Sequence, residues 1–322
     1  MTKKRLYVMV AISVVLLIAT LSLFSAISHY NDNKLQGKLV FAQTYDQGFK
    51  LDRIEIIMPT EKVVLQQKDG YWLVPDKGNY YADFSLMHKF LSSFNESIFM
   101  VNVPYDEKLW AEKYLNNAEK NEKNSGMFIK TYAENKLLDE LIVGLPSGDK
   151  KYFFARRPQD KNAWLISGNF NLPVMAEDWL LNPIAEIPET VIETITFGTK
   201  KIQKYNKLSD FSDERGRLGL VKPLLDVLKG VKIVNAVNED LLKSDKNVPV
   251  EEITVTTFWG LRFVFKFFKM QEKIWTTIHL DTTVLPQTEI MSFIDNNRFL
   301  YENWFFELPE NQLYVMSKYF AQ

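Results

Sequence analysis

The chain has 322 residues, no cysteine and a formal net charge of −1. The absence of cysteine excludes thiolate catalysis, disulfides and cysteine-ligated zinc or iron–sulfur sites. A charge so close to zero provides neither a broadly basic surface nor an acidic tail, so we expect no nucleic-acid binding. With 46% hydrophobic and 14% aromatic residues, the chain can form one large core or two small ones.

Charge is absent from residues 6–27, a run that begins at Leu6, ends at Ile27 and directly follows three basic residues. A helix of this length spans about 33 Å, close to the ~30 Å hydrocarbon core of a bilayer. Basic residues on the N-terminal side indicate a cytoplasmic N-terminus. We therefore predict a single-pass protein of a bacterial inner membrane, with residues 1–5 in the cytoplasm, a transmembrane helix over residues 6–28 and a periplasmic body.

The same run has a second interpretation, a secretory signal peptide cleaved after a small residue such as Ala26 or Ser28. The apolar core of a signal peptide normally has about 7–15 residues, and this run is longer. We therefore favour an uncleaved anchor, which makes the lipid bilayer the first partner that the sequence predicts.

Short strands and turns begin after a polar tether over residues 29–50. Apolar residues alternate over residues 54–58, and Asp69-Gly70 between two apolar runs predicts a hairpin. Asp83 then predicts the N-cap of a helix with apolar residues at helical spacing.

The next segment predicts a small antiparallel sheet. Asp106 is placed to cap a short helix, and Gly144 begins a turn that ends at Gly148. Alternation with period two and short turns is typical of antiparallel pairing. The expected strands are residues 98–103, 127–133, 137–143, 151–155 and 164–167, with the helix over residues 106–114 and a solvated loop over residues 116–125.

The second half of the chain repeats this order of elements. Individual matches are weak, but they occur in the same order at a nearly constant spacing, which predicts a duplicated α+β unit. We expect an α+β fold with two tandem repeats of a small antiparallel sheet plus helices, over residues 51–190 and 191–322. The matched segments are 102–109 with 235–242, 127–132 with 252–257, 178–181 with 303–306 and 187–189 with 308–310, and residues 192–197 and 202–205 match the opening hairpin.

Several segments together suggest a family. They are Asp69-Gly-Tyr-Trp-Leu73, the helix start at Ala82-Asp83, Trp164-Leu-Ile-Ser-Gly168, Asp178-Trp-Leu-Leu181 and Ile187-Pro188. This pattern resembles an uncharacterised bacterial family known as domain of unknown function 4340, over residues 51–197 with a more divergent second copy. The chain departs from it at Lys113-Tyr-Leu-Asn-Asn117, where the family tends to have a tyrosine–glycine–leucine turn. The resemblance implies a membrane-anchored extracytoplasmic body, in some members linked to ABC-transporter systems of the gliding-motility type, and it transfers no catalytic residue.

The candidate functional residues are two aromatic side chains and a pair of arginines. Trp259 and Phe268 belong to the most aromatic stretch of the chain. Each is a candidate for a partner surface or the membrane interface, although the hydrophobic core is the favoured interpretation. Arg156 and Arg157 are candidates for binding anionic head groups or carboxylates, and solvated loop charge explains them equally well.

No motif defines a reaction. The three histidines lack the spacing of a metal site, and no phosphate-binding glycine loop is present. We therefore predict a non-enzymatic, membrane-anchored accessory or scaffold protein of an envelope complex, with a protein partner and no cofactor or metal. The alternative is a periplasmic binding module for a glycan, lipid or peptide in the groove between the repeats, and a hydrolase with carboxylates brought together by the fold ranks third.

Overall fold

A computed structural model describes residues 34–120, 122–213, 221–242, 248–270, 272–282 and 288–319. The predicted transmembrane run, residues 6–27, lies outside these ranges. Among the helices that are described, none combines the length and the apolar character needed to cross a bilayer.

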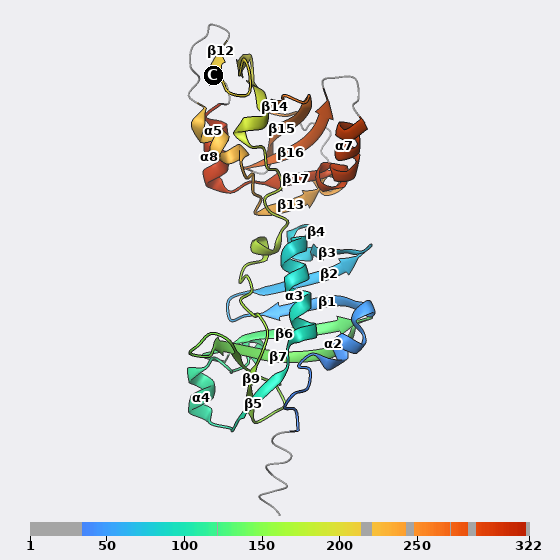
Figure 1. Cartoon of the computed structure of the whole chain (residues 1–322), viewed down its shortest axis with the longest axis vertical. Coiled ribbons are helices and arrows are strands. Elements are labelled where there is room, and N and C mark those ends of the chain that lie inside the picture. Colours follow the sequence, from blue (N-terminus) through green and yellow to red (C-terminus); the bar gives the residue numbers. More distant parts are fainter. Residues whose placement is uncertain are drawn as a thin grey trace, which may run out of the picture. The chain divides into compact units, whose positions relative to one another are not determined.

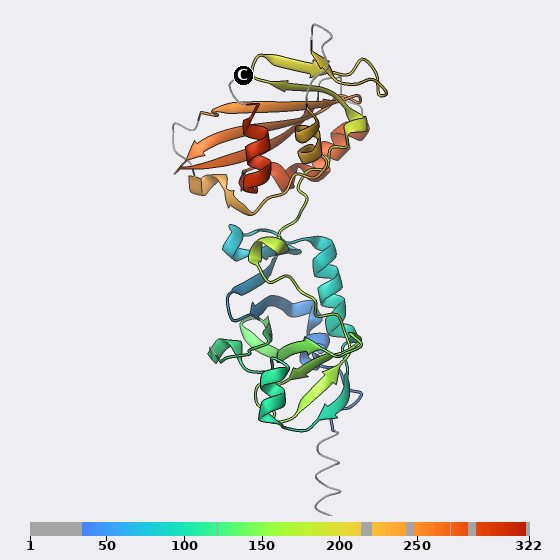
Figure 2. The same cartoon turned by 90° about the vertical axis from the view of Figure 1, so that its left-hand side faces the viewer.

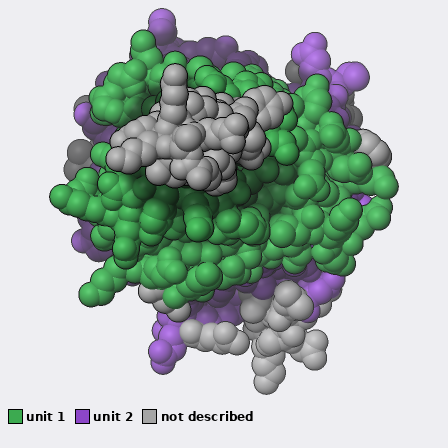
Figure 3. All heavy atoms as spheres, turned by 90° about the horizontal axis from the view of Figure 1, so that it is seen from below, with its two compact units in different colours: residues 1–62, 88–172 green, residues 63–87, 173–322 purple. Residues whose placement is uncertain are grey.

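The described chain is an α+β protein with two large antiparallel sheets and few helices (Figure 1). It divides into two compact units, which Figure 3 shows in separate colours. Unit 1 comprises residues 1–62 and 88–172, and unit 2 comprises residues 63–87 and 173–322. The predicted boundary at residue 190 falls between the two sheets. The division into compact units differs from it, because residues 63–87 belong to unit 2.

The first sheet has nine strands in the order β4-β3-β2-β1-β6-β7-β8-β9-β5. Its central strands β1 and β6 are largely buried, with Ile54, Ile56, Phe128 and Ile129 in the core. The strands are β1 (Leu51–Ile57), β2 (Lys62–Lys68), β3 (Tyr71–Val74), β4 (Tyr80–Tyr81), β5 (Phe99–Val103), β6 (Met127–Ala133), β7 (Lys136–Pro146), β8 (Phe153–Arg156) and β9 (Ala163–Ile166).

The second sheet has eight strands in the order β12-β11-β10-β14-β15-β16-β17-β13. Its longest pair, β15 with β16, runs from Leu261 opposite Thr282 to Met270 opposite Lys273. The strands are β10 (Ile192–Phe197), β11 (Lys200–Gln203), β12 (Ser212–Asp213), β13 (Asn235–Asn238), β14 (Glu251–Thr257), β15 (Leu261–Met270), β16 (Lys273–Thr282) and β17 (Trp304–Glu307).

The two sheets have corresponding strand orders. Strands β1, β6, β7, β8, β9 and β5 follow one another in the first sheet as β10, β14, β15, β16, β17 and β13 do in the second. The correspondence extends to an irregularity, because the pairing register shifts between Leu51 and Arg53 in β1 and between Ile192 and Thr194 in β10. A β-bulge at the same point of the same strand pair is a specific structural feature.

The helices lie beside the sheets. In the second half, α5 and α8 pack together, and α7 contacts β16 (Figures 1 and 2). In the first half, α3 buries Met87, Phe90 and Phe94, and the Phe94 ring lies 4.4 Å from that of Phe41. The α-helices are α2 (Ala42–Asp46), α3 (Phe84–Glu96), α4 (Glu107–Glu112), α5 (Lys222–Leu228), α6 (Glu239–Leu242), α7 (Thr288–Tyr301) and α8 (Glu310–Ser317).

Local sequence signals explain several boundaries and confirm their predictions. The hairpin at Asp69-Gly70 forms between β2 and β3, and both turn residues have positive φ. The Asp83 carboxylate accepts a hydrogen bond from the backbone N–H of Leu86 at 2.7 Å, and Asp106 caps α4 in the same way. Tyr114 has φ 58°, the left-handed conformation that glycine adopts most readily.

Three sequence predictions differ from the structure. Residues 29–50 are not simply a tether, because in their described part Val40 and Phe41 are buried and residues 42–46 form α2. The turn predicted over residues 144–148 comes later, because β7 continues to Pro146, the backbone N–H of Leu145 donates to the Lys113 carbonyl at 2.9 Å, and the N–H of Lys150 donates to the Ser147 carbonyl at 2.8 Å. The match of residues 178–181 with 303–306 also fails. Residues 176–179 form a 3₁₀ turn, whereas residues 304–307 form β17, whose counterpart by strand order is β9.

Replacing Gly144 by Ala is expected to lower the free energy of unfolding by about 1–3 kcal/mol. A Cβ at this position would lie 2.0 Å from the Lys113 carbonyl oxygen, so the backbone of one segment must move. Gly148→Ala is the matched control, because its Cβ would meet nothing within 4 Å. Urea unfolding of both variants provides the comparison, and equal stability of the two would contradict this account of β7.

Candidate functional site

A pocket of about 540 Å³ opens on unit 2, and we call it the Trp259 pocket. Three segments form its walls: the chain that precedes β10, the turn between β14 and β15, and the first half of α7. The lining is mostly apolar, with two carboxylates and one hydroxyl. The lining residues are Glu186, Ile187, Pro188, Val191, Thr257, Trp259, Leu261, Phe263, Glu289, Ile290 and Phe293.

The β14–β15 turn positions Trp259. Gly260 has φ 86° and its N–H donates to the Thr257 carbonyl at 2.8 Å, which closes the turn. Trp259 is 53% exposed, and the Lys207 ammonium lies 5.5 Å from the centroid of its ring. A large aromatic side chain held by a tight turn with half its surface in solvent is suited to contact a ligand.

The opposite walls are fixed to each other. The Tyr301 hydroxyl at the end of α7 donates to the Ile184 carbonyl at 2.8 Å, just before the pocket segment that contains Ile187. Burial raises the pKa of Tyr301 to about 12, so this hydroxyl keeps its proton. Ile290 and Ile294 of α7 are buried, whereas Phe293 remains 44% exposed at the pocket.

Thr257 provides a buried polar atom. The residue is 2% exposed, and its hydroxyl has no hydrogen-bond partner in the part of the chain that the structure describes. An unpaired buried hydroxyl costs about 1–3 kcal/mol, so such groups are rare unless something else uses them. Thr257 lines the pocket, but its hydroxyl oxygen is covered by the protein, so the residue contributes to the wall and offers no accessible polar atom.

Two carboxylates stand at the pocket. Glu186 and Glu289 are both exposed, and within the described ranges neither forms an ion pair. Both therefore remain able to attract a cationic group.

The corresponding position in the first half is different. There the turn between β6 and β7 borders a hollow lined by Gln43, Asp46, Glu134 and Lys136, among others. Strand order makes β6–β7 the counterpart of β14–β15. The same turn therefore borders a polar hollow in one half and an apolar pocket in the other.

Of the two predicted aromatic candidates, only Trp259 lies at a surface. Phe268 is 9% exposed, pairs with Trp275 across the strands, and contacts the Phe305 ring edge-on at a centroid distance of 5.2 Å. This packing removes Phe268 from any partner surface.

The two predicted arginines have different environments. Arg156 is 5% exposed, its Nε donates to the Leu115 carbonyl at 2.8 Å, and its guanidinium lies 3.9 Å from the centroid of the Trp110 ring. These contacts give it a structural role, holding the segment after α4. Arg157 is only half-buried and donates through Nη2 to the Val40 carbonyl at 3.4 Å.

Arg157 lines a second pocket, of about 500 Å³, which we call the basic pocket. It belongs entirely to unit 1 and is formed by the start of the described chain, β5 and the connection between β8 and β9. The residues that line it are Lys34, Leu35, Asn102, Arg157, Asp160, Lys161, Asn162 and Trp164.

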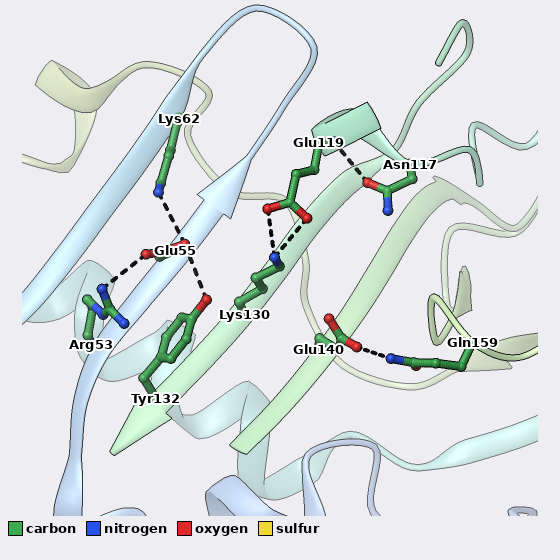
Figure 4. A network of polar contacts seen from close by, with 9 residues as sticks. All are labelled: Arg53, Glu55, Lys62, Asn117, Glu119, Lys130, Tyr132, Glu140 and Gln159. Carbon is green, nitrogen blue, oxygen red and sulfur yellow. Dashed lines mark hydrogen bonds and ion pairs between the residues drawn. The ribbon is translucent and has the colours of Figure 1, made fainter. Parts of the chain in front are cut away.

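A cluster of charged and polar side chains, separate from the two pockets, lies on the first sheet. Figure 4 shows Arg53, Lys62 and Tyr132 directed toward Glu55. The Glu55 carboxylate is 3.3 Å from Arg53 and 3.2 Å from Lys62, and it accepts a hydrogen bond from the Tyr132 hydroxyl at 3.4 Å. Glu55 is buried, and the two cations compensate its charge. The group therefore links β1 to its neighbours, and the Glu55 carboxylate is not available to bind a ligand.

The described residues contain no group of three or more histidine, aspartate and glutamate side chains arranged to hold a metal ion. Comparison of the chain with protein-family models, curated proteins and solved structures found no match. The resemblance to domain of unknown function 4340 therefore stays a prediction.

Sequence reasoning missed α7, which supplies Glu289, Ile290 and Phe293 to the Trp259 pocket. A signal was present, because Ile290 and Ile294 are spaced one helical turn apart and both are buried. The contribution of residues 186–191 had no such signal, since it depends on which segments the fold brings together.

We expect Thr257→Val to raise the free energy of unfolding by about 1–2 kcal/mol, because it removes a buried hydroxyl that lacks a partner and keeps the side-chain shape. Thr276→Val is the matched control. Thr276 is fully buried in β16 with an unpaired hydroxyl in the described structure, but it does not line the pocket. Urea unfolding should show a gain for both, and a loss of stability in Thr257→Val would mean that its hydroxyl is already satisfied.

Proposed function

We propose that this protein is a non-enzymatic, membrane-anchored binding protein of the bacterial envelope. In this proposal, unit 2 holds an apolar segment of a partner protein in the Trp259 pocket. The observation that carries it is the pocket itself, in which exposed aromatic side chains surround an apolar interior of about 540 Å³.

The pocket has the properties of an interaction hot spot. Such sites are enriched in tryptophan and are surrounded by residues that exclude water from the contact. Trp259 and Phe293 are the two exposed aromatic residues of the lining, and Phe263 forms a buried part of it. Burial of one large apolar side chain in such a pocket contributes about 1.5–3 kcal/mol.

The charges favour a peptide segment over an anionic lipid. Glu186 and Glu289 would repel a phosphate group and attract lysine or arginine beside the buried side chain. We therefore expect the partner to present an apolar or aromatic side chain with a basic residue near it.

The hydroxyl in the pocket supports binding over catalysis. A threonine nucleophile requires a base within hydrogen-bond reach, and among the described residues nothing bonds to the Thr257 hydroxyl.

The wider proposal includes a duplication and an anchor. Support for the duplication is the corresponding strand order of the two sheets with a bulge at the same point. Support for the anchor is the uncharged run of residues 6–27 behind three basic residues. An accessory role in an envelope complex, such as a transporter, follows if the partner is itself a membrane protein.

Site-specific photo-crosslinking tests the pocket. A photoreactive phenylalanine analogue at Phe293 of the full-length protein, in native membranes, is expected to give a discrete protein adduct. The analogue at Tyr314, which is exposed elsewhere in unit 2, is the matched control and should not give that adduct. In the Phe293 background, Trp259→Ala and a Glu186→Lys, Glu289→Lys double variant should each reduce the adduct at least about fivefold, since each removes one attractive element. A lipid-sized adduct, or equal adducts at both positions, would overturn the proposal.

The anchor has a separate test. We expect the full-length protein to sediment with membranes, to resist extraction by high salt or alkaline carbonate, and to dissolve only in detergent. Intact-mass measurement should find the N-terminal segment retained. A soluble protein whose first residue follows Ala26 or Ser28 would establish the signal-peptide alternative instead.

A further inference from the structure

The basic pocket of unit 1 differs in charge from the rest of the chain. Three of its lining residues are cations, Lys34, Arg157 and Lys161, and one is an anion, Asp160. The whole chain carries a formal net charge of −1, so this local excess of positive charge is a specific feature. The pocket volume of about 500 Å³ is in the range of small-molecule binding sites.

The lining contains a single acid, Asp160, against these three cations, so its side chains carry an excess of positive charge. Arg156, the neighbour of Arg157, does not line the pocket and instead donates to the Leu115 carbonyl.

The pocket is built on fixed elements. Trp164 of β9 is 3% exposed and pairs with Asn102 of β5, and both line the pocket. Arg157 is oriented by its hydrogen bond to the Val40 carbonyl, and its guanidinium lies 5.3 Å from the centroid of the Phe99 ring. Asn162 accepts a hydrogen bond from the Tyr105 N–H at 3.3 Å. An arginine held in this manner presents its remaining N–H groups in the fork geometry that matches phosphate oxygens.

The pocket is also close in sequence to the predicted anchor. Lys34 follows Ile27 by seven residues, and seven residues span at most about 25 Å when fully extended. If residues 6–27 cross the bilayer, the pocket therefore stays near the head groups of the leaflet from which the chain emerges. A cluster of cations at that distance interacts with anionic lipids, at about 1 kcal/mol for each lysine or arginine near the surface.

From these observations we infer that the basic pocket binds the phosphate head group of an anionic phospholipid in that leaflet. Arg157 would make the bidentate contact, Lys34 and Lys161 would supply the surrounding charge, and Asn102 and Trp164 would line the wall for the glycerol. The inference deepens the proposed membrane attachment, since it assigns unit 1 a second, head-group-specific contact with the bilayer.

The test uses the full-length protein in a mild non-ionic detergent. Native mass spectrometry counts bound lipid during titration with short-chain phosphatidylglycerol, with short-chain phosphatidylcholine and with inorganic phosphate as separate ligands. We expect phosphatidylglycerol to bind with a stoichiometry of one and with affinity that falls as salt is raised. Equal binding of phosphatidylcholine would overturn the inference, and so would binding of inorganic phosphate as tight as that of the lipid.

The variants separate charge from folding. Lys34→Gln and Lys161→Gln remove exposed charges and should each weaken phosphatidylglycerol binding by about fivefold, whereas Lys136→Gln, an exposed lysine elsewhere in unit 1, should not. Arg157→Gln should abolish measurable binding, and Arg157→Lys should keep part of it while losing the bidentate contact. If Arg157→Gln does not fold, the two lysine variants decide, and unchanged binding in both would overturn the inference.

This test does not depend on the fate of the anchor. The titration measures the pocket in detergent, so cleavage after Ala26 would remove the proposed membrane attachment without affecting the measurement. Loss of lipid binding with an intact anchor and an intact Phe293 adduct would reject only the inference made here.

Discussion

The antiparallel pairing of β1 with β6, and of β10 with β14, is the contact on which the rest of each half depends. Each pairing joins strands that are separated along the chain by several elements, among them the strand that ends at the far edge of the sheet. The next three strands then follow in sequence order, and β5 or β13 pairs with the last of them. Such non-local pairings have a loop-closure cost, so they are expected to be the slow and cooperative step of folding. The bulge at the same point indicates that the β1–β6 and β10–β14 pairs have the same local geometry.

By strand order, the connection between β8 and β9 in the first sheet corresponds to the connection between β16 and β17 in the second. Each connection contributes residues to one of the two candidate pockets. In the first half that connection is the short segment after β8, which supplies Arg157, Asp160 and Lys161 to the basic pocket. In the second half it contains α7, which supplies Glu289, Ile290 and Phe293 to the Trp259 pocket. The central strands are constrained by pairing and by the core, whereas this connection is free to differ in length and charge. The two halves therefore share the order of their strands and differ in the connection that lines each candidate pocket.

Sequence reasoning succeeded where structure is determined locally. Turn chemistry and capping predict the Asp69-Gly70 hairpin and the helix starts at Asp83 and Asp106. Alternation predicts the order of the strands along the chain. It failed where a distant segment decides. Gly144 has the composition of a turn, but the carbonyl of Lys113 lies where a side chain would be and holds the segment in β7. Alternation placed Phe268 on the outer face of β15, yet Trp275 and Phe305 cover that end of the strand. Of the four candidate site residues, Trp259 and Arg157 line pockets, whereas Arg156 and Phe268 are buried. Arg156 is the last residue of β8 and is buried, whereas Arg157 begins the connection that follows it.

Although the formal net charge is −1, the two pockets differ in charge. The basic pocket has an excess of cations, whereas the Trp259 pocket has two carboxylates. A net charge near zero argues against a large electrostatic footprint such as that of a nucleic-acid-binding protein, but it does not argue against a small anion site. A tethered pocket needs little intrinsic affinity, because attachment to the bilayer keeps head groups at a high effective concentration around it. For the phosphate site proposed above, three cations, one of them the oriented Arg157 guanidinium, would then be sufficient, whereas a protein in free solution would need a more enclosed pocket. The effective concentration at the Trp259 pocket is raised in the same way only if its partner is held in the same membrane. The predicted anchor therefore favours a membrane-bound partner for this pocket and its two carboxylates as well.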